Sequence, residues 1–256
     1  MRVILLSCYP LVDKLDYKCK VLTGLVSRKP EALSLVYVNT RFIDYYREFR
    51  KRYRLKDLFY YSSKGKGNIL SYRSQGVETL AEKLGVDVLM AKSFNKKCID
   101  YLSEFGPDII HNLSGLYIPK AVLRIPRYGV IGGHYGALPK IRGSDTIRWT
   151  ILLNHLMVVS HMFLASKLDM GDILLKMKVD VNKGDDIKTI RGKCQEKNAV
   201  GHLVVYDRIS CGILKPVKQG RSEGSTFFRM GDFLRNEVDA LLVNCQYSHY
   251  VDSDGG

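Results

Sequence analysis

The chain has 256 residues, of which 46% are hydrophobic, and its 40 Lys and Arg against 26 Asp and Glu give a net charge of +14. This length excludes more than one large domain with a small extension, and no apolar run reaches the about 20 residues that a membrane-spanning helix needs. The basic balance favours an anionic partner, such as a nucleotide-linked substrate, a nucleic acid or a membrane surface, without choosing among them.

Strands and helices alternate along the chain. Short apolar runs predict strands over 3–7, 33–38, 86–90, 108–113, 128–131, 157–164 and 173–181. Longer periodic stretches, several with an N-cap or a terminal glycine, predict helices over 15–26, 77–84, 97–105, 118–123, 146–153 and 186–209. This alternation predicts an α/β fold: a Rossmann-like, open, mainly parallel twisted sheet with helices on both faces.

The first apolar run, residues 3–7, is too short for a signal peptide, and Asp13 and Lys14 follow it closely. We therefore expect a buried first strand. The cysteines are scattered and form no C-x-x-C pair, which favours reduced thiols in a cytoplasmic protein over a disulfide framework or a zinc site. They are Cys8, Cys19, Cys98, Cys194, Cys211 and Cys245.

Basic and aromatic residues are interleaved over 41–54. The aromatic residues recur at helical spacing, which favours a packed helix with a solvated basic side. A nucleic-acid surface is the alternative, because basic side chains bind phosphates and aromatic rings stack on nucleobases. The glycine- and lysine-rich segment 62–68 is predicted to be a flexible basic loop, since it lacks the spacing of a phosphate-binding P-loop.

The composition changes after Leu214. Residues 215–225 are rich in turn-forming residues, and 227–242 is predicted to be a short extension packed on the main domain. The predicted organisation is one catalytic domain over 1–214 and a C-terminal extension over 215–256.

One glycine-rich stretch, residues 132–143, follows the strand predicted over 128–131 and contains His134. The carboxyl end of a strand in an open α/β sheet is the usual place for a ligand crevice. Ser144 and Asp145 are expected to cap the next helix. By itself this pattern also fits a glycine-rich connection with a hydrogen-bonded structural histidine.

A second stretch comes about 35 residues after His134 and reads Asp169-x-Gly171-x-Ile173. Together with Leu138-Pro139-x-x-Arg142-Gly143 and a helical Trp149, it resembles the signature of the folate-dependent formyltransferases. Segments 107–110 and 118–123 also look like this family, and the resemblance covers roughly 76–182. It implies an enzyme that takes a formyl group from N10-formyltetrahydrofolate, without a metal.

The resemblance assigns catalytic roles to two residues. His134 would bind the developing oxyanion, and Asp169 would hold the imidazole or a bridging water and accept a proton from the ammonium. Without the resemblance, Asp169 would be interpreted as a turn cap. His155 and His161 are spaced too irregularly for a metal site and are expected to be structural.

Gly132 departs from the family pattern, which has Asn two residues before the histidine. Losing one oxyanion donor typically costs about 10²–10³ in rate. Asn112 or Ser114 could replace the donor, or the backbone N–H groups of Gly132 or Gly133 could serve. The third alternative is a degenerate member that binds without catalysing.

The resemblance also implies two binding regions. The folate would lie against a wall formed by His111, Leu113, Gly115 and Leu116, with the loop around Leu168 opposite. The acceptor would lie near Tyr135, Lys140 and Arg142. Lys140 and Arg142 could contact phosphates, or Arg142 could only pin its loop.

The family acts on initiator methionyl-tRNA, glycinamide ribonucleotide, hydroxyornithine and nucleotide-linked amino sugars. The tRNA enzymes carry a sizeable C-terminal domain, whereas about 40 residues follow Leu214 here. We therefore expect a small-molecule amine, namely a nucleotide-linked amino sugar, with nucleic acid not favoured and a homodimer allowed. The alternatives are another amine, such as an aminoacyl-tRNA or an amino acid, a degenerate folate- or nucleotide-binding relative, and a basic RNA-binding protein.

Overall fold

The computed structural model describes residues 1–8, 16–38, 76–220 and 222–251. These residues form two compact units, Met1–Val130 and Ile131–Gly256, which are described in turn. The predicted helix over 41–54 and the predicted basic loop over 62–68 lie outside the described residues.

The first unit contains a four-stranded parallel sheet in the order β3-β2-β1-β4. Its strands are β1 (Arg2–Cys8), β2 (Ala32–Val38), β3 (Asp87–Ala91) and β4 (Ile109–Asn112). Residues 3–6 of β1 are fully buried, as expected for a parallel strand that is covered on both faces. The apolar runs that predicted these strands are therefore the core of this unit.

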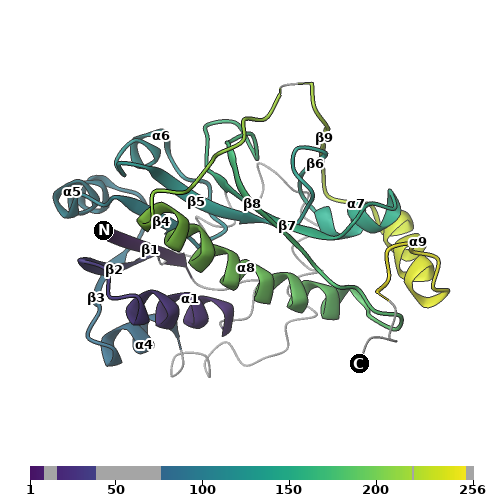
Figure 1. Ribbon diagram of the computed structural model, residues 1–256, viewed down its shortest axis with the longest axis horizontal. Helices are drawn as coiled ribbons and strands as arrows, with labels where there is room; N and C mark the ends of the chain where they lie inside the picture. Colours follow the sequence, from purple (N-terminus) through teal and green to yellow (C-terminus); the bar gives the residue numbers. More distant parts are fainter. Residues whose placement is uncertain (9–15, 39–75, 221, 252–256) are drawn as a thin grey trace. The chain divides into compact units, whose positions relative to one another are not determined.

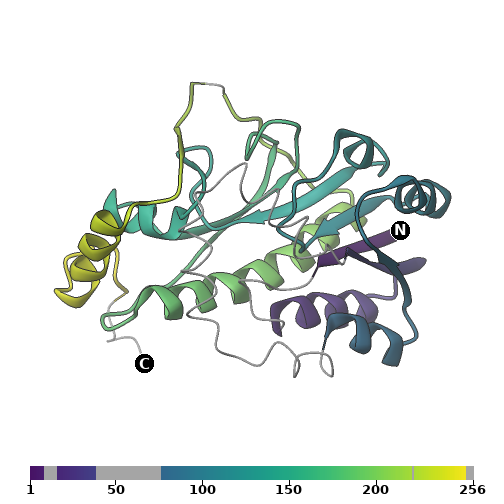
Figure 2. The same ribbon diagram turned by 180° about the vertical axis from the view of Figure 1, so that it is seen from behind.

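Helices cover both faces of this sheet. One face carries α1 (Asp16–Ser27) and α4 (Val77–Lys83), and the other carries α5 (Lys96–Phe105) and α6 (Lys120–Leu123), as Figures 1 and 2 show. Asn95 caps α5 by accepting a hydrogen bond from the Cys98 amide at 3.0 Å, and Gly106 ends that helix in the left-handed region, with φ 58°.

The second unit contains an antiparallel arrangement, β5-β7-β8. These strands are β5 (Gly129–His134), which begins just before the unit boundary, β7 (Val158–Phe163) and β8 (Ile173–Lys178). The long helix α8 (Ile187–Ser210) lies along β7 and β8, and α7 (Thr146–Leu152) packs beside α9 (Asp232–Val243) (Figures 1 and 2). Apolar residues of all these helices share one buried cluster that includes Ile147, Val159, Cys194 and Val238.

A second, two-stranded parallel sheet joins β6 (Ile141–Gly143) to β9 (Ser225–Phe227). The sequence did not predict either strand. Each is three residues long, and the pairing uses backbone groups, so neither strand carries a hydrophobic period that could have indicated it.

The predicted α/β fold class, with mainly parallel strands, is confirmed, and the helices and strands predicted within the described residues are found within a few residues of their predicted bounds. One boundary differs, and one local prediction was wrong. The strand predicted over 128–131 extends to His134, so the imidazole is carried by a strand. Asp145, in the left-handed region with φ 52°, does not cap α7, because its carboxylate instead accepts from Met230 and Arg235. The predicted domain boundary at Leu214 stays a prediction.

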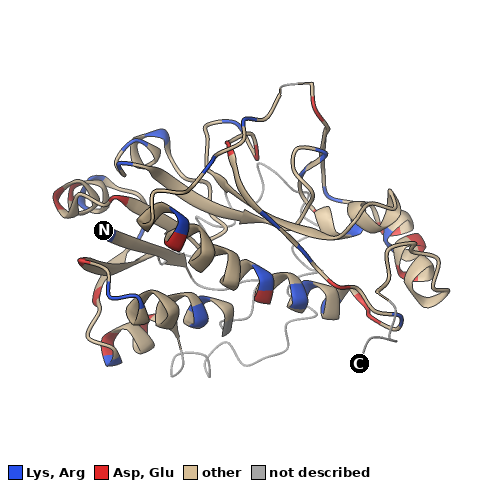
Figure 3. Cartoon of the chain, viewed as in Figure 1, with Lys and Arg blue, Asp and Glu red and all other residues tan. Residues whose placement is uncertain are grey.

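Charge is spread over both units. Figure 3 shows Lys and Arg on helices and strands of each, with Asp and Glu among them on α5 and α8. Residues 39–75, outside the described ranges, hold ten Lys and Arg against three Asp and Glu. In the part of the chain that the structure describes, no helix is long and apolar enough to cross a membrane.

His161 is fully buried on β7, where its Nε2 donates to the carbonyl oxygen of Asn198 at 3.1 Å. Its ring lies 5.0 Å from that of His202, and Gly201 leaves room for it, since a Cβ there would collide with the imidazole. Burial lowers the pKa of His161 to about 4. The structural role expected for this residue agrees with these contacts.

We expect acid to destabilise the fold through His161. Because its folded pKa lies below the value of about 6.5 in the unfolded chain, its contribution is fully present above pH 6.5 and is lost as the pH falls toward 4. The lowered pKa corresponds to about 3 kcal/mol of unfolding free energy over that window. Urea unfolding of wild type and His161→Gln from pH 7 to pH 4 measures the effect. The variant should lose less unfolding free energy than wild type over this range. An NMR titration that places the imidazole pKa near 6.5 would contradict the expectation.

Candidate active site

His134 stands at the end of β5 and is 7% exposed. Its Nε2 lies 2.8 Å from the carbonyl oxygen of Ile141 in β6. A carbonyl oxygen only accepts, so Nε2 carries a proton and donates it. Gly136 permits this contact, since a Cβ there would come within 2.9 Å of Nε2 and 3.0 Å of the Ile141 oxygen. The glycines that follow the histidine therefore bring its own loop back against the ring.

Ser160 fixes the turn after His134. It lies opposite His134 in the β5–β7 register and is fully buried. Its hydroxyl donates to the Gly136 carbonyl at 2.7 Å and accepts from the Leu138 amide at 3.2 Å. Sequence reasoning missed this residue. The available signal was a single hydroxyl, next to His161, inside a mostly apolar strand.

Asp169 adopts a left-handed conformation with φ 52°, and its side chain is 12% exposed. Its Oδ2 accepts the Gly143 amide at 2.8 Å, from β6, and lies 3.6 Å from Nδ1 of His134. The carboxylate is therefore turned toward β6 and the imidazole, in contrast to the alternative of a cap within its own turn. The structure brings together the two residues to which the family resemblance gave catalytic roles.

The hydrogen bond to Ile141 decides which imidazole nitrogen faces the carboxylate. Nε2 is committed to the carbonyl, so Nδ1 is the nitrogen on the Asp169 side. At 3.6 Å, Nδ1 and Oδ2 are beyond hydrogen-bonding distance but close enough to form an ion pair when the ring is charged. In the neutral ring Nδ1 offers a lone pair. In the charged ring it offers a proton on the side of Asp169.

Gly171, in the same motif, is required by packing. A Cβ at this position would collide with the backbone carbonyl of Phe163 at the end of β7. The Phe163 amide in turn donates to the Asp172 carbonyl at 3.0 Å. The glycine lets the turn that carries Asp169 lie directly on the end of β7, which explains the Asp-x-Gly spacing.

The predicted acceptor residues have different surroundings. Arg142 is 2% exposed, and its guanidinium donates to the side chain of Gln219 at 3.2 Å and to the Gly220 carbonyl at 3.3 Å. Of the two roles expected for Arg142, this geometry favours pinning the loop. Lys140 is exposed, and Tyr135 packs partly buried against the apolar cluster of the second unit.

Leu164 occupies the space beside Gly132. A Cβ at position 132 would come within 2.5 Å of its Cδ2 and 3.1 Å of its Cγ. An apolar side chain therefore lies where the family asparagine would begin.

The residues predicted to line the folate belong mostly to the first unit. His111 is fully buried on β4, Leu113 is buried just after it, and Gly115 has φ 64° in the turn that leads to Leu116. Leu168, predicted for the opposite wall, is 56% exposed beside Asp169 in the second unit. That these residues line one pocket stays a prediction.

The two donors considered as substitutes for the family asparagine bond to each other. The side-chain oxygen of Asn112 accepts from the amide and the hydroxyl of Ser114, at 3.0 and 2.6 Å. The Ser114 hydroxyl also accepts the Leu116 amide at 3.1 Å. Their contacts therefore shape the turn after β4, and a catalytic contribution from either residue stays a prediction.

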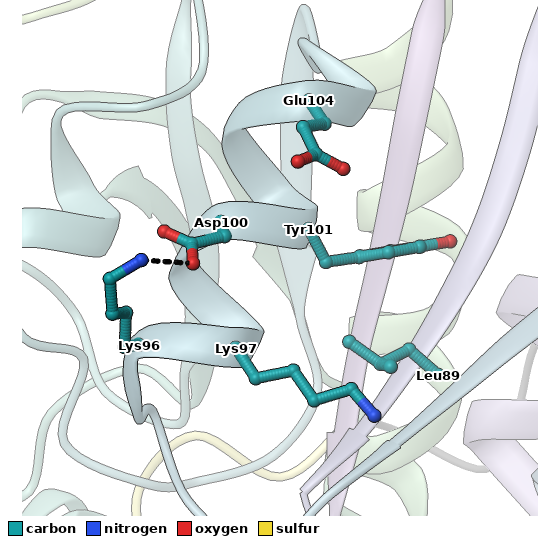
Figure 4. Close-up of a pocket in the computed structure, with 6 residues that line it drawn as sticks. All are labelled: Leu89, Lys96, Lys97, Asp100, Tyr101 and Glu104. Carbon is teal, nitrogen blue, oxygen red and sulfur yellow. Dashed lines mark hydrogen bonds and ion pairs between the residues drawn. The ribbon is translucent and has the colours of Figure 1, made fainter.

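A shallow hollow in the first unit lies between β3 and α5 (Figure 4). It contains an exposed ion pair, Lys96 with Asp100 at 2.7 Å, and none of the predicted site residues. Among the described residues, no group of three or more His, Cys, Asp or Glu is arranged to hold a metal ion.

Comparison with known proteins identifies relatives of the chain. A family model described as "Formyl transferase" matches residues 63–205. The methionyl-tRNA formyltransferase of Ehrlichia ruminantium strain Gardel is 33% identical over 185 residues, which cover 71% of this chain and 60% of that protein. That of Geobacillus sp. strain WCH70 is 33% identical over 159 residues, covering 61% and 50%. The matched part thus spans about half to three fifths of these relatives.

Solved structures share the fold at low sequence identity. An N-formyltransferase from Helicobacter canadensis, in complex with folinic acid and dTDP-3-aminofucose, superposes with a TM-score of 0.61 at 13% identity, covering 99% of this chain and 84% of that one. Glycinamide ribonucleotide transformylase 1 from Symbiobacterium toebii superposes with a TM-score of 0.60 at 13% identity, and the match covers 85% of this chain and 94% of that one. Since the family model matches more than half of its residues, the chain belongs to the formyl transferase family.

Proposed function

We propose that this protein transfers a formyl group from N10-formyltetrahydrofolate to the primary amine of a nucleotide-linked amino sugar. The observation that carries the proposal is the pair of buried His134 and partly buried Asp169, 3.6 Å apart and each fixed by β6. Family membership supports formyl transfer as the reaction, and a folate as its donor.

His134 stabilises the oxyanion that forms when the amine attacks the formyl carbon. Nε2 is held by Ile141, so the charged ring donates from Nδ1, and the carboxylate of Asp169 stabilises that charge. When the tetrahedral intermediate collapses, the incoming nitrogen loses a proton and the departing nitrogen gains one. Asp169 and Nδ1 are the acceptor and the donor that this exchange requires.

Lys140 supports an acceptor that carries phosphate. Its side chain is exposed, and it directly precedes Ile141, whose carbonyl holds the imidazole. A lysine in this position offers a point charge to a phosphate near the reacting centre. Arg142, by contrast, is occupied by Gln219 and Gly220, so we assign phosphate contact to Lys140 alone.

An aminoacyl-tRNA is the second candidate acceptor. The relatives at 33% identity are methionyl-tRNA formyltransferases, and a tRNA also brings phosphates to Lys140. A tRNA acceptor predicts many phosphate contacts and therefore a steep fall in affinity with salt, whereas a nucleotide sugar predicts a shallow one.

A formyl-transfer assay tests the function. The protein is incubated with N10-formyltetrahydrofolate and, separately, with dTDP- and UDP-linked amino sugars, methionylated initiator tRNA and hydroxyornithine, and products are identified by mass spectrometry. Formylation of an amino sugar is expected, and formylation of the tRNA alone would replace that acceptor. Calorimetry with 5-formyltetrahydrofolate in the presence of a chelator should show binding. Binding without turnover on any amine would identify a degenerate relative.

We expect Gly132→Asn to lower turnover. The new side chain must displace Leu164, whose Cδ2 lies 2.5 Å from the position that the asparagine Cβ would take. Position 132 is on β5, the strand that carries His134. Leu164 is a flexible side chain at its contact end, so the cost falls on the local geometry more than on folding. Steady-state kinetics and thermal unfolding of the variant measure the two effects.

The double variant Gly132→Asn/Leu164→Ala makes room for the amide and is the control. If position 132 faces the reaction, the double variant recovers turnover relative to Gly132→Asn, because an oxyanion donor is worth about 10²–10³ in rate. Equal turnover of the single and double variants would show that Leu164 is not what limits the asparagine.

A further inference from the structure

The segment after α8 is bound to both parts of the candidate site. Val217 exchanges two backbone hydrogen bonds of 2.8 Å with Ile173, at the start of β8. Farther along, β9 pairs with β6, and the Ser225 amide donates to the Lys140 carbonyl at 3.0 Å. Between these anchors lies Gln219, in the region that the sequence described only as turn-rich.

Gln219 makes three contacts with the site. Its Nε2 donates to the carbonyl oxygens of Asp169 and Gly171, at 3.1 and 2.6 Å. Its Oε1 accepts from Nε of Arg142 at 3.2 Å. These contacts fix the orientation of the amide, because carbonyls only accept and a guanidinium only donates.

The three partners of Gln219 belong to the two segments that hold the catalytic pair. Arg142 lies in β6 between Ile141, which binds His134, and Gly143, which binds Asp169. The other two partners are in the turn that carries Asp169. One amide therefore links the strand that orients both catalytic side chains to the turn that supplies one of them.

We infer that Gln219 is a positioning residue for the His134–Asp169 pair, acting through the main chain of residues 169–171 and through Arg142. The inference rests on the proposed function of that pair. The contacts of Gln219 set the distance between the Asp169 carboxylate and the His134 imidazole, and stabilisation of the charged ring depends on that distance. A displacement of about 1 Å at a reacting group can cost about 10²-fold in rate.

Gln219→Met and Gln219→Glu test the inference, with Lys218→Met as the matched control at an exposed neighbour. Methionine keeps the length of the side chain and removes every polar contact. Glutamate keeps an acceptor for Arg142 and sets a carboxylate against the carbonyls of Asp169 and Gly171. We expect kcat to fall about 10- to 100-fold in both variants with KM little changed, and Lys218→Met to match wild type.

Amide exchange at Gly143 provides a readout that does not depend on turnover. The Gly143 N–H is donated to Asp169, so its exchange by NMR should accelerate in both Gln219 variants and not in Lys218→Met. Unchanged Gly143 exchange in a folded Gln219→Met or Gln219→Glu protein would overturn the inference. If Gln219→Met does not fold, the comparison of Gln219→Glu with Lys218→Met decides. A wild-type protein without formyl transfer would refute the proposed function, while the exchange experiment would still decide whether Gln219 positions Asp169.

Discussion

Replacing His134 with alanine is expected to lower kcat by about 10²–10⁴, because the variant loses the group that stabilises the oxyanion and moves a proton. Asp169→Asn should lower kcat by a similar factor, for a different reason. Its side-chain oxygen still accepts the Gly143 amide, so the turn stays in place, but the negative charge 3.6 Å from Nδ1 is gone. Steady-state kinetics with N10-formyltetrahydrofolate and the best acceptor measure both losses.

Lys183→Gln serves as the control, because this lysine is exposed between β8 and α8 and belongs to none of the segments predicted to form the site. It should keep wild-type kcat. Calorimetry with 5-formyltetrahydrofolate and thermal unfolding should show that His134→Ala and Asp169→Asn remain folded and bind the folate. Should either variant retain more than about a tenth of wild-type kcat, the assignment of its residue to the chemical step would be wrong.

The sequence predicted the elements of the fold whose signal is local. The apolar run at 3–7 is found as β1, and the helix predicted over 186–209 is found as α8, Ile187–Ser210. Hydrophobic periodicity and caps, such as Asp186 accepting the Thr189 amide at 2.7 Å, specify such elements within a few residues of sequence. The His134–Asp169 pair was predicted in a different way, from the resemblance of two motifs to a known family.

What the sequence could not predict depends on partners far along the chain. Asp145 has the residue type and position of a helix cap, but a buried arginine 90 residues later takes its carboxylate. Gln219 is one polar residue in a turn-rich segment, and its amide acquires a role only when β6 and the 169–171 turn meet it. No periodicity or local motif reports such contacts, because they depend on tertiary packing.

Arg235→Met is expected to lower the free energy of unfolding by about 3–5 kcal/mol, the largest stability effect expected for a single substitution here. Arg235 on α9 and Asp145 before α7 are 6% and 9% exposed, with NH2 and Oδ2 3.0 Å apart. Without the arginine, the carboxylate remains largely buried and keeps the hydrogen bond from the Met230 amide, at 3.0 Å. The energy lost is mainly that of a buried charge without a counterion. Urea unfolding at pH 7 measures it.

A second ion pair between the same helices gives the matched control. Arg148 on α7 and Asp239 on α9 lie 3.6 Å apart, but Asp239 is 55% exposed, so Asp239→Asn should cost less than about 1 kcal/mol. The double variant Arg235→Met/Asp145→Asn should be more stable than Arg235→Met, since it also removes the stranded charge and asparagine tolerates the left-handed backbone of position 145. If Arg235→Met lowered the free energy of unfolding as little as Asp239→Asn, burial of the Arg235–Asp145 pair would not make that pair strongly stabilising. In that case α9 would be held to α7 mainly by the apolar cluster around Ile147 and Val238.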